Sequence, residues 1–190
     1  MNKTKRSIFE SALRIFSQSG YSEATMDDIA VNAGVAKGTL YYHFKSKEEI
    51  FKYVISEGME VITEEMEEAT KNIADPIQKI VAVCKVQFGL VYRNRDFFKV
   101  VMSQLWGQES RQFELREVVK VYIASIERFL KEAMEAGALK KGETKFMAYT
   151  LFGSICSGAI YELINDDLKS IDDLMESTTS YILKGIEVSK

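Results

Sequence analysis

The sequence predicts an all-α protein, and three observations support that prediction. Its 190 residues include a single proline, Pro76, and proline is the residue that most strongly breaks helices. No run of alternating β-branched residues is bounded by turn signals, as a strand would be. Leu, Met, Glu, Lys and Ala are abundant instead, and these residues favour helices. The hydrophobic content of 46% is enough for a substantial core.

Start and stop signals divide the first 46 residues into three short helices. The first is expected over about 4–18, closed by a glycine, and Thr25 caps the second, which ends at Gly34. The third follows over about 36–44, after the short turn "AGVAKG". A glycine-containing turn between two short helices is typical of a helix-turn-helix unit. Its small core is expected to comprise Ile29, Ala33, Val35, Leu40 and Phe44.

The rest of the chain is expected to form longer helices. Their predicted ranges are 47–71, 76–92, 96–106, 112–136, 144–164 and 170–187. Their predicted caps are Ser46, Asp75, Asp96 and Ser170, and Asp75 is followed by a proline at the first helical position. The sequence therefore predicts two domains, a helix-turn-helix domain over 1–46 and a helical ligand-binding and dimerisation domain over 47–190.

Charge and leader signals limit the classes of function. Residues 1–52 carry a net charge of +2 and the remainder a net charge of −5. This distribution argues against a general polyanion binder but allows a locally positive helix-turn-helix domain (the head). The N-terminus has no apolar leader, and the longest uncharged stretch, 146–161, is too short to span a bilayer. Cys84 and Cys156 are expected to be buried free thiols rather than a disulfide. We expect a cytoplasmic protein without a membrane partner.

The third helix carries the residues that point to function. Leu40 and Phe44 are four positions apart and face the core, which turns a set of polar side chains outward. That set is Lys37, Gly38, Thr39, Tyr42 and His43. A helix N-terminus with these side chains suits a DNA major groove and its phosphates, and Lys47 begins the next helix, where anions are also favoured. The alternative is an ordinary polar surface, which would account for any one of these residues by itself.

An enzyme is the remote alternative. His43 has no nucleophile in a recognisable context and no second His or Cys at metal-ligand spacing. The sequence also lacks a dinucleotide fingerprint, a phosphate-binding loop lysine and a zinc-protease motif. We therefore expect no enzymatic activity, no cofactor and no metal.

The segment "TMDDIAVNAGVAKGTLYYHFKSKEEIF" resembles the DNA-binding signature of the TetR/AcrR family of bacterial transcriptional regulators, over about residues 8–55. The resemblance implies phosphate contacts by Thr25, Tyr41, His43 and Lys47. It implies base-side contacts by Lys37, Gly38, Thr39 and Tyr42. One departure is Ala36, where many relatives carry a serine that caps the recognition helix and reaches a phosphate.

Sequence-specific binding usually needs two heads on successive major grooves, so a homodimer on a pseudo-palindromic double-stranded operator is expected. Small residues at four-residue spacing in "FGSICSGAIYEL" would let another helix pack closely, within the chain or in a partner. The family places its dimer interface on the last two helices. The expected interface residues are Gly153, Ser154, Ser157, Gly158 and Tyr181.

Aromatic and methionine side chains recur at helical spacing through the body of the chain. Most are expected to be plain core, but in related proteins this region encloses an apolar pocket. The expected pocket residues are Phe88, Tyr92, Phe98, Met102, Trp106, Tyr122 and Phe152. The resulting hypothesis is a dimeric repressor released from its operator by a small, mostly hydrophobic effector. The alternative is a DNA-bound architectural or interaction protein with the same head and no inducer.

The helix that begins at Lys47 is expected to link the head to the pocket, so a ligand that moves it changes the spacing of the two heads. Gly58 within this helix is either a bending point or a place where a glycine relieves crowding.

Overall fold

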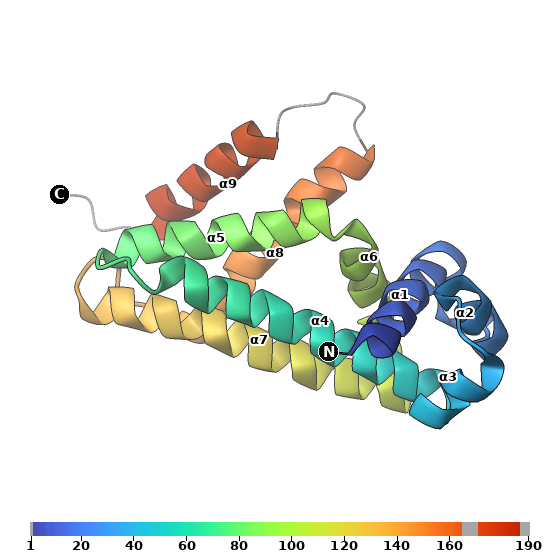
Figure 1. Cartoon of the computed structure of the whole chain (residues 1–190). Coiled ribbons are helices and arrows are strands. Elements are labelled where there is room, and N and C mark those ends of the chain that lie inside the picture. The colour runs from blue at the N-terminus through green and yellow to red at the C-terminus, as the bar shows by residue number, and fades with distance from the viewer. Residues whose placement is uncertain (1, 165–170, 187–190) are drawn as a thin grey trace. The chain divides into compact units, whose positions relative to one another are not determined.

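Helices account for the regular structure of the computed structural model, which describes residues 2–164 and 171–186 (Figure 1). The helices in these ranges are α1 (Lys3–Glu23), α2 (Met26–Ala33), α3 (Lys37–His43), α4 (Lys47–Thr70), α5 (Pro76–Arg93), α6 (Arg95–Gln104), α7 (Ser110–Glu135), α8 (Thr144–Ile164) and α9 (Ile171–Ile186). The predicted all-α class is confirmed. The expected cap at Ser170 lies outside the described residues.

The chain divides into two compact units. The first unit is Met1–Glu60 with Arg95–Val119, and the second unit is Val61–Asn94 with Lys120–Lys190. Within the first, α1 packs on α2 and α6, and α2 packs on α3. Within the second, α5, α8 and α9 pack on one another. Helices α4 and α7 contribute residues to both units.

The core of the first unit forms where the apolar faces of the short helices meet. Ile8 and Ala12 of α1 and Ile29 of α2 are fully buried, and Leu40 of α3 is buried in the same unit. The predicted core residues Ala33 and Val35 are half-buried. The Ser11 hydroxyl donates a hydrogen bond of 2.8 Å to the Ile29 carbonyl, which ties α1 to α2 inside the core.

Local capping signals account for most helix ends. The Thr25 hydroxyl accepts a hydrogen bond of 3.1 Å from the Asp28 amide, and the helix stops at Gly34, whose φ of 66° is the left-handed conformation that glycine adopts without strain. Asp75 caps α5 ahead of Pro76 as expected. The predicted cap at Asp96 is wrong, because α6 already begins at Arg95. The Asp96 carboxylate instead accepts a hydrogen bond of 2.5 Å from the Ser17 hydroxyl of α1.

In the second unit, the core contains both cysteines. Cys84 of α5 and Cys156 of α8 are buried free thiols. Burial raises the pKa of each thiol to about 12, so both stay protonated and unreactive at neutral pH. Across residues 2–164 and 171–186, no helix combines the length and the hydrophobicity that a membrane crossing requires.

Candidate functional site

The exposed face of α3 has the geometry that the sequence predicts. Leu40 is fully buried and anchors the helix, while the predicted contact residues on its other faces are open to solvent. Tyr42 is 78% exposed and Tyr41 is 39% exposed, so both aromatic rings are accessible to a molecule outside the chain. A Cβ at Gly38 would meet no atom within 4 Å, so packing within the described chain does not require a glycine there. This face of α3 is therefore accessible to a binding partner outside the chain.

Two of the predicted contact residues already have polar partners. The Lys37 ammonium donates a hydrogen bond of 2.8 Å to the Asp27 carboxylate, and this bond is the main reason that the pKa of Lys37 is raised. Both side chains are exposed, so the ion pair is weak and readily exchanged for a phosphate. The Thr25 hydroxyl donates a hydrogen bond of 2.5 Å to the Asp28 carboxylate while it caps α2. His43 is half-buried, with its ring 5.2 Å from that of Tyr42.

Lys47 is held inside the first unit. Its ammonium donates hydrogen bonds of 2.7, 2.9 and 2.7 Å to the carbonyls of Tyr21, Ser22 and Ala24. The same ammonium lies 4.7 Å from the centre of the Tyr21 ring. An ammonium group has three donors, and all three are used here. Lys47 therefore closes the C-terminal end of α1, just before the cap of α2, and a phosphate contact would have to replace one of these bonds.

A second cation packs against the same tyrosine, and sequence analysis missed it. The Arg111 guanidinium of α7 lies 3.9 Å from the centre of the Tyr21 ring, a cation–π distance. Arg111 is only 8% exposed and also forms an ion pair with Glu109. Burial raises the pKa of Tyr21, and the charge of Arg111 opposes that rise. The sequence does contain one indication that Arg111 faces inward. It stands four positions before the buried Leu115 and therefore lies on the same face of α7.

The predicted pocket residues do not form one group in a single unit. Phe98, Met102 and Trp106 belong to the first unit, and Phe88, Tyr92, Tyr122 and Phe152 belong to the second. In the second, the rings of Phe88 and Tyr92 stack at 6.2 Å, and those of Tyr122 and Phe152 meet edge to face at 6.1 Å. Trp106 is 85% exposed.

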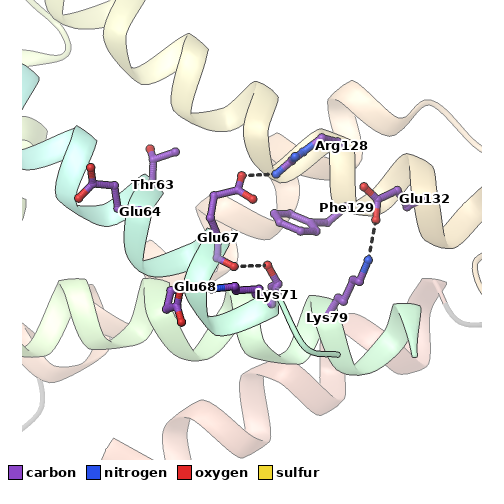
Figure 2. Close-up of a pocket in the computed structure, with 10 residues that line it drawn as sticks. Thr63, Glu64, Glu67, Glu68, Lys71, Lys79, Arg128, Phe129 and Glu132 are labelled. Carbon is purple, nitrogen blue, oxygen red and sulfur yellow. Dashed lines mark hydrogen bonds and ion pairs between the residues drawn. The ribbon is translucent and has the colours of Figure 1, made fainter. Parts of the chain in front are cut away.

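A cleft of about 570 Å³ lies in the second unit. The residues that line it are drawn in Figure 2 and are mostly charged. Arg128 forms an ion pair with Glu67, and Lys79 donates to Glu132 over 3.0 Å, as the figure shows. Phe129 is the aromatic side chain of the lining. None of the predicted pocket residues lines this cleft, so it does not have the character expected of a hydrophobic effector site.

The small residues of α8 face two ways. Gly158 is buried, and a Cβ there would lie 3.3 Å from a ring carbon of Phe88, so packing against α5 explains this glycine. Gly153 is exposed, and a Cβ added to it would meet no atom within 4 Å. Ser154 and Ser157 donate to carbonyls of their own helix, at 2.8 and 2.6 Å. A groove of about 750 Å³ between α8 and α9 is lined by Ser154, Ser157, Gly158 and Tyr181, among others.

Exposed apolar side chains also lie on α8 and α9. Large apolar side chains are exposed beside the small ones: Ile160 is 52% exposed, Ile164 73% and Tyr181 75%. Exposed apolar groups at this density mark interaction surfaces. In the part of the chain that the structure describes, no group of three or more His, Cys, Asp or Glu side chains is placed to hold a metal ion.

Comparisons with known proteins agree with this architecture. The family model for bacterial regulatory proteins of the tetR family matches residues 8–54. A second model, for the C-terminal region of YsiA-like proteins, matches residues 55–185, which is more than half of the chain. The fatty acid metabolism regulator protein of Bacillus subtilis (strain 168) is 29% identical over 182 residues, covering 94% of this chain and 93% of that protein.

Solved structures show the same likeness over nearly all of the chain. A candidate fatty acid metabolism regulator of Clostridium perfringens is 46% identical, with a TM-score of 0.89, over 96% of this chain and all of that one. The regulator FadR of Bacillus subtilis, solved with stearoyl-CoA, is 26% identical with a TM-score of 0.85, over 96% and 99% of the two chains. The chain therefore belongs to the TetR family and is a DNA-binding transcriptional regulator.

Proposed function

We propose that the protein is a cytoplasmic, homodimeric repressor that binds a pseudo-palindromic operator and is released from it by a fatty acyl effector. It acts without catalysing a reaction. In this proposal Lys37, Gly38, Thr39 and Tyr42 meet base edges, while Thr25, Tyr41 and His43 meet phosphates. Gly153, Ser154, Ser157 and Gly158 of α8, with Tyr181 of α9, form the dimer interface.

The observation that carries the proposal is the open face of α3. The buried Leu40 anchors α3 in the core, so Tyr42 and its polar neighbours lie on a packed helix rather than on a loop. Direct readout needs such side chains at base edges, held in register by phosphate contacts around them. Two such faces in a dimer match the two half-sites of a palindrome.

The proposed effector class rests on the relatives. A protein 46% identical to this chain is a candidate regulator of fatty acid metabolism, and the Bacillus subtilis FadR structure contains stearoyl-CoA. The buried aromatic side chains of the second unit, Phe88, Tyr92 and Tyr122, supply the apolar surroundings that an acyl chain prefers. An acyl-CoA that binds the DNA-free conformation more tightly lowers operator affinity by its differential affinity for the two states.

Release is tested with the purified protein and an operator selected from random duplex DNA. Fluorescence anisotropy of the labelled operator is expected to fall when stearoyl-CoA is added to the preformed complex. Coenzyme A without an acyl chain is the control and is expected to leave the complex intact. Unchanged anisotropy with every acyl-CoA tested would favour the architectural alternative, in which the same head has no inducer.

Replacing Tyr42 by alanine is expected to weaken specific operator binding by about tenfold or more, because each good base contact contributes about 1–3 kcal/mol of discrimination. The stability of the protein is expected to change by no more than about 0.5 kcal/mol, since the side chain is 78% exposed. Affinity is measured by anisotropy at two salt concentrations, and stability by urea denaturation.

Phe113→Ala provides the matched control. Phe113 lies on α7, outside both α3 and the proposed dimer interface, and is 54% exposed, so an exposed aromatic side chain is again replaced by alanine. Operator affinity is expected to stay at the wild-type level in this variant. Equal losses in both variants, or a large loss of stability in Tyr42→Ala, would contradict a base-contacting role for Tyr42.

A further inference from the structure

The second unit contains a buried glutamine whose amide completes no full hydrogen bond within the described residues. Gln87 of α5 is 2% exposed, and neither its Oε1 nor its Nε2 forms a hydrogen bond within the described residues. The hydroxyl of Tyr122, on α7, is also buried and also lacks a hydrogen bond there. Buried polar groups in folded proteins are nearly always satisfied, so two in one core require an explanation.

These two side chains face each other. Burial is the largest cause that raises the pKa of the Tyr122 hydroxyl well above its ordinary value. The Cys156 and Cys84 thiols raise this pKa further. A hydrogen-bonding interaction with Gln87 opposes that rise, which places the amide next to the hydroxyl, although the two groups fall outside the geometry of a full hydrogen bond. The hydroxyl therefore keeps its proton at physiological pH and remains a hydrogen-bond donor.

The walls around this pair are apolar. The Tyr122 ring meets the Phe152 ring edge to face at 6.1 Å, and Phe88, the next residue after Gln87, is 1% exposed. Thr179 of α9 hydrogen-bonds the Cys84 thiol. The amide and the hydroxyl are thus polar groups among mostly apolar side chains, and a few polar groups in apolar surroundings are what orients a ligand in a binding site.

The unpaired state is costly for the free protein. A buried amide that has given up water without gaining a partner destabilises the fold, and a methionine of similar length would not. The cost disappears when an incoming oxygen atom accepts a hydrogen bond from Nε2 or from the Tyr122 hydroxyl. A hydroxyl on the ligand would also donate to Oε1 of Gln87.

We propose that the Gln87 amide and the Tyr122 hydroxyl together bind an oxygen atom on the acyl part of the effector. That oxygen is either the thioester carbonyl or a hydroxyl group on the chain. The assignment rests on the proposed function, and it adds that the effector is chosen by a buried polar contact as well as by its apolar length. Gln87 and Tyr122 are then specificity-determining residues.

The test is a cycle of two proteins and three ligands, measured by isothermal titration calorimetry. The proteins are the wild type and Gln87→Met. The ligands are stearoyl-CoA, S-octadecyl-CoA, which lacks the carbonyl, and 3-hydroxystearoyl-CoA. If the carbonyl is bound, the wild type prefers stearoyl-CoA to the thioether by about tenfold, and Gln87→Met loses that preference. If a chain hydroxyl is bound, the about tenfold preference is for the 3-hydroxy ligand and is lost in the same variant.

Thermal unfolding of the ligand-free proteins separates the proposed role from a purely structural one, because the two roles predict opposite changes in the melting temperature. Gln87→Met is expected to unfold at a higher temperature than the wild type, because an unpaired amide has been removed. Gln78→Met, at an exposed position of the same helix, is the control and is expected to change neither the melting temperature nor the ligand preference. Tyr122→Phe keeps the ring and is expected to reduce the same ligand preference as Gln87→Met.

Two outcomes would overturn the proposal, and they are distinguishable. If Gln87→Met lowers the melting temperature and keeps the wild-type ligand preferences, the amide is a structural group and only this assignment fails. If the wild type binds none of the three ligands, the acyl-CoA effector class of the proposed function fails, and this assignment fails with it.

Discussion

Replacing Lys47 by methionine is expected to lower the free energy of unfolding by about 2 kcal/mol, because three hydrogen bonds from a charged donor are lost together. The variant leaves the carbonyls of Tyr21, Ser22 and Ala24 without their partner. It also removes the ammonium from the Tyr21 ring. Operator affinity is expected to fall by more than about tenfold, since α2 begins immediately after this segment and its cap, Thr25, loses a fixed position.

Urea denaturation and operator anisotropy on the same preparation check this prediction. Lys45→Met is the matched control, because Lys45 is exposed, lies two positions earlier and donates to a single carbonyl, that of Tyr41. Its stability is expected to stay close to that of the wild type. If Lys47→Met instead keeps full stability and loses only operator affinity, Lys47 acts as a phosphate contact, as the family resemblance implies.

Replacing Gly58 by leucine is expected to destabilise the protein by about 3 kcal/mol through overpacking. A Cβ at this position of α4 would lie 2.1 Å from Cε2 and 2.5 Å from Cζ of Phe97, far inside van der Waals contact. Phe97 is 3% exposed, so its ring has little room to withdraw. Helix propensity works in the other direction but contributes only about 1 kcal/mol, which is too little to offset the clash.

Gly89→Leu separates crowding from any general effect of removing a helical glycine. A Cβ at Gly89 would also come close to a neighbour, 2.3 Å from Nη2 of Arg93, but that side chain is 70% exposed and can move aside. Its stability is expected to stay within about 1 kcal/mol of the wild type. Equal destabilisation of the two variants would show that Phe97 is not the cause. The sequence left open whether Gly58 bends the helix or relieves crowding, and the continuous α4 with Phe97 against it supports relief of crowding.

The features that were predictable from the sequence are those with local causes. Thr25, Gly34 and the Asp75–Pro76 pair mark helix ends through hydrogen bonds and backbone angles within a few residues. The open face of α3 follows from the four-residue spacing of Leu40 and the core-facing Phe44. Each of these could be derived without knowledge of distant parts of the chain.

The features that were not predictable depend on residues far apart in the sequence. Tyr21, Lys47 and Arg111 meet only after three helices have packed, and no periodic pattern links positions so widely separated. Asp96 carries a capping signal, yet its carboxylate pairs with Ser17, 79 positions away. The unpaired amide of Gln87 is likewise invisible in the sequence, because a glutamine at that spacing is equally compatible with an exposed helix face.

Trp106 gives this regulator an optical reporter of its own. It is the sole tryptophan of the chain, and 85% of its surface is open to water. Selective excitation of indole therefore reports on one position only, between α6 and α7, with emission at the long wavelength typical of indole in water and strong quenching by iodide. An effector that shields this ring will shift the emission to shorter wavelength and protect it from iodide, whereas one that binds elsewhere will leave the quenching unchanged. Contact between an effector and this position can thus be tested in the unlabelled wild-type protein.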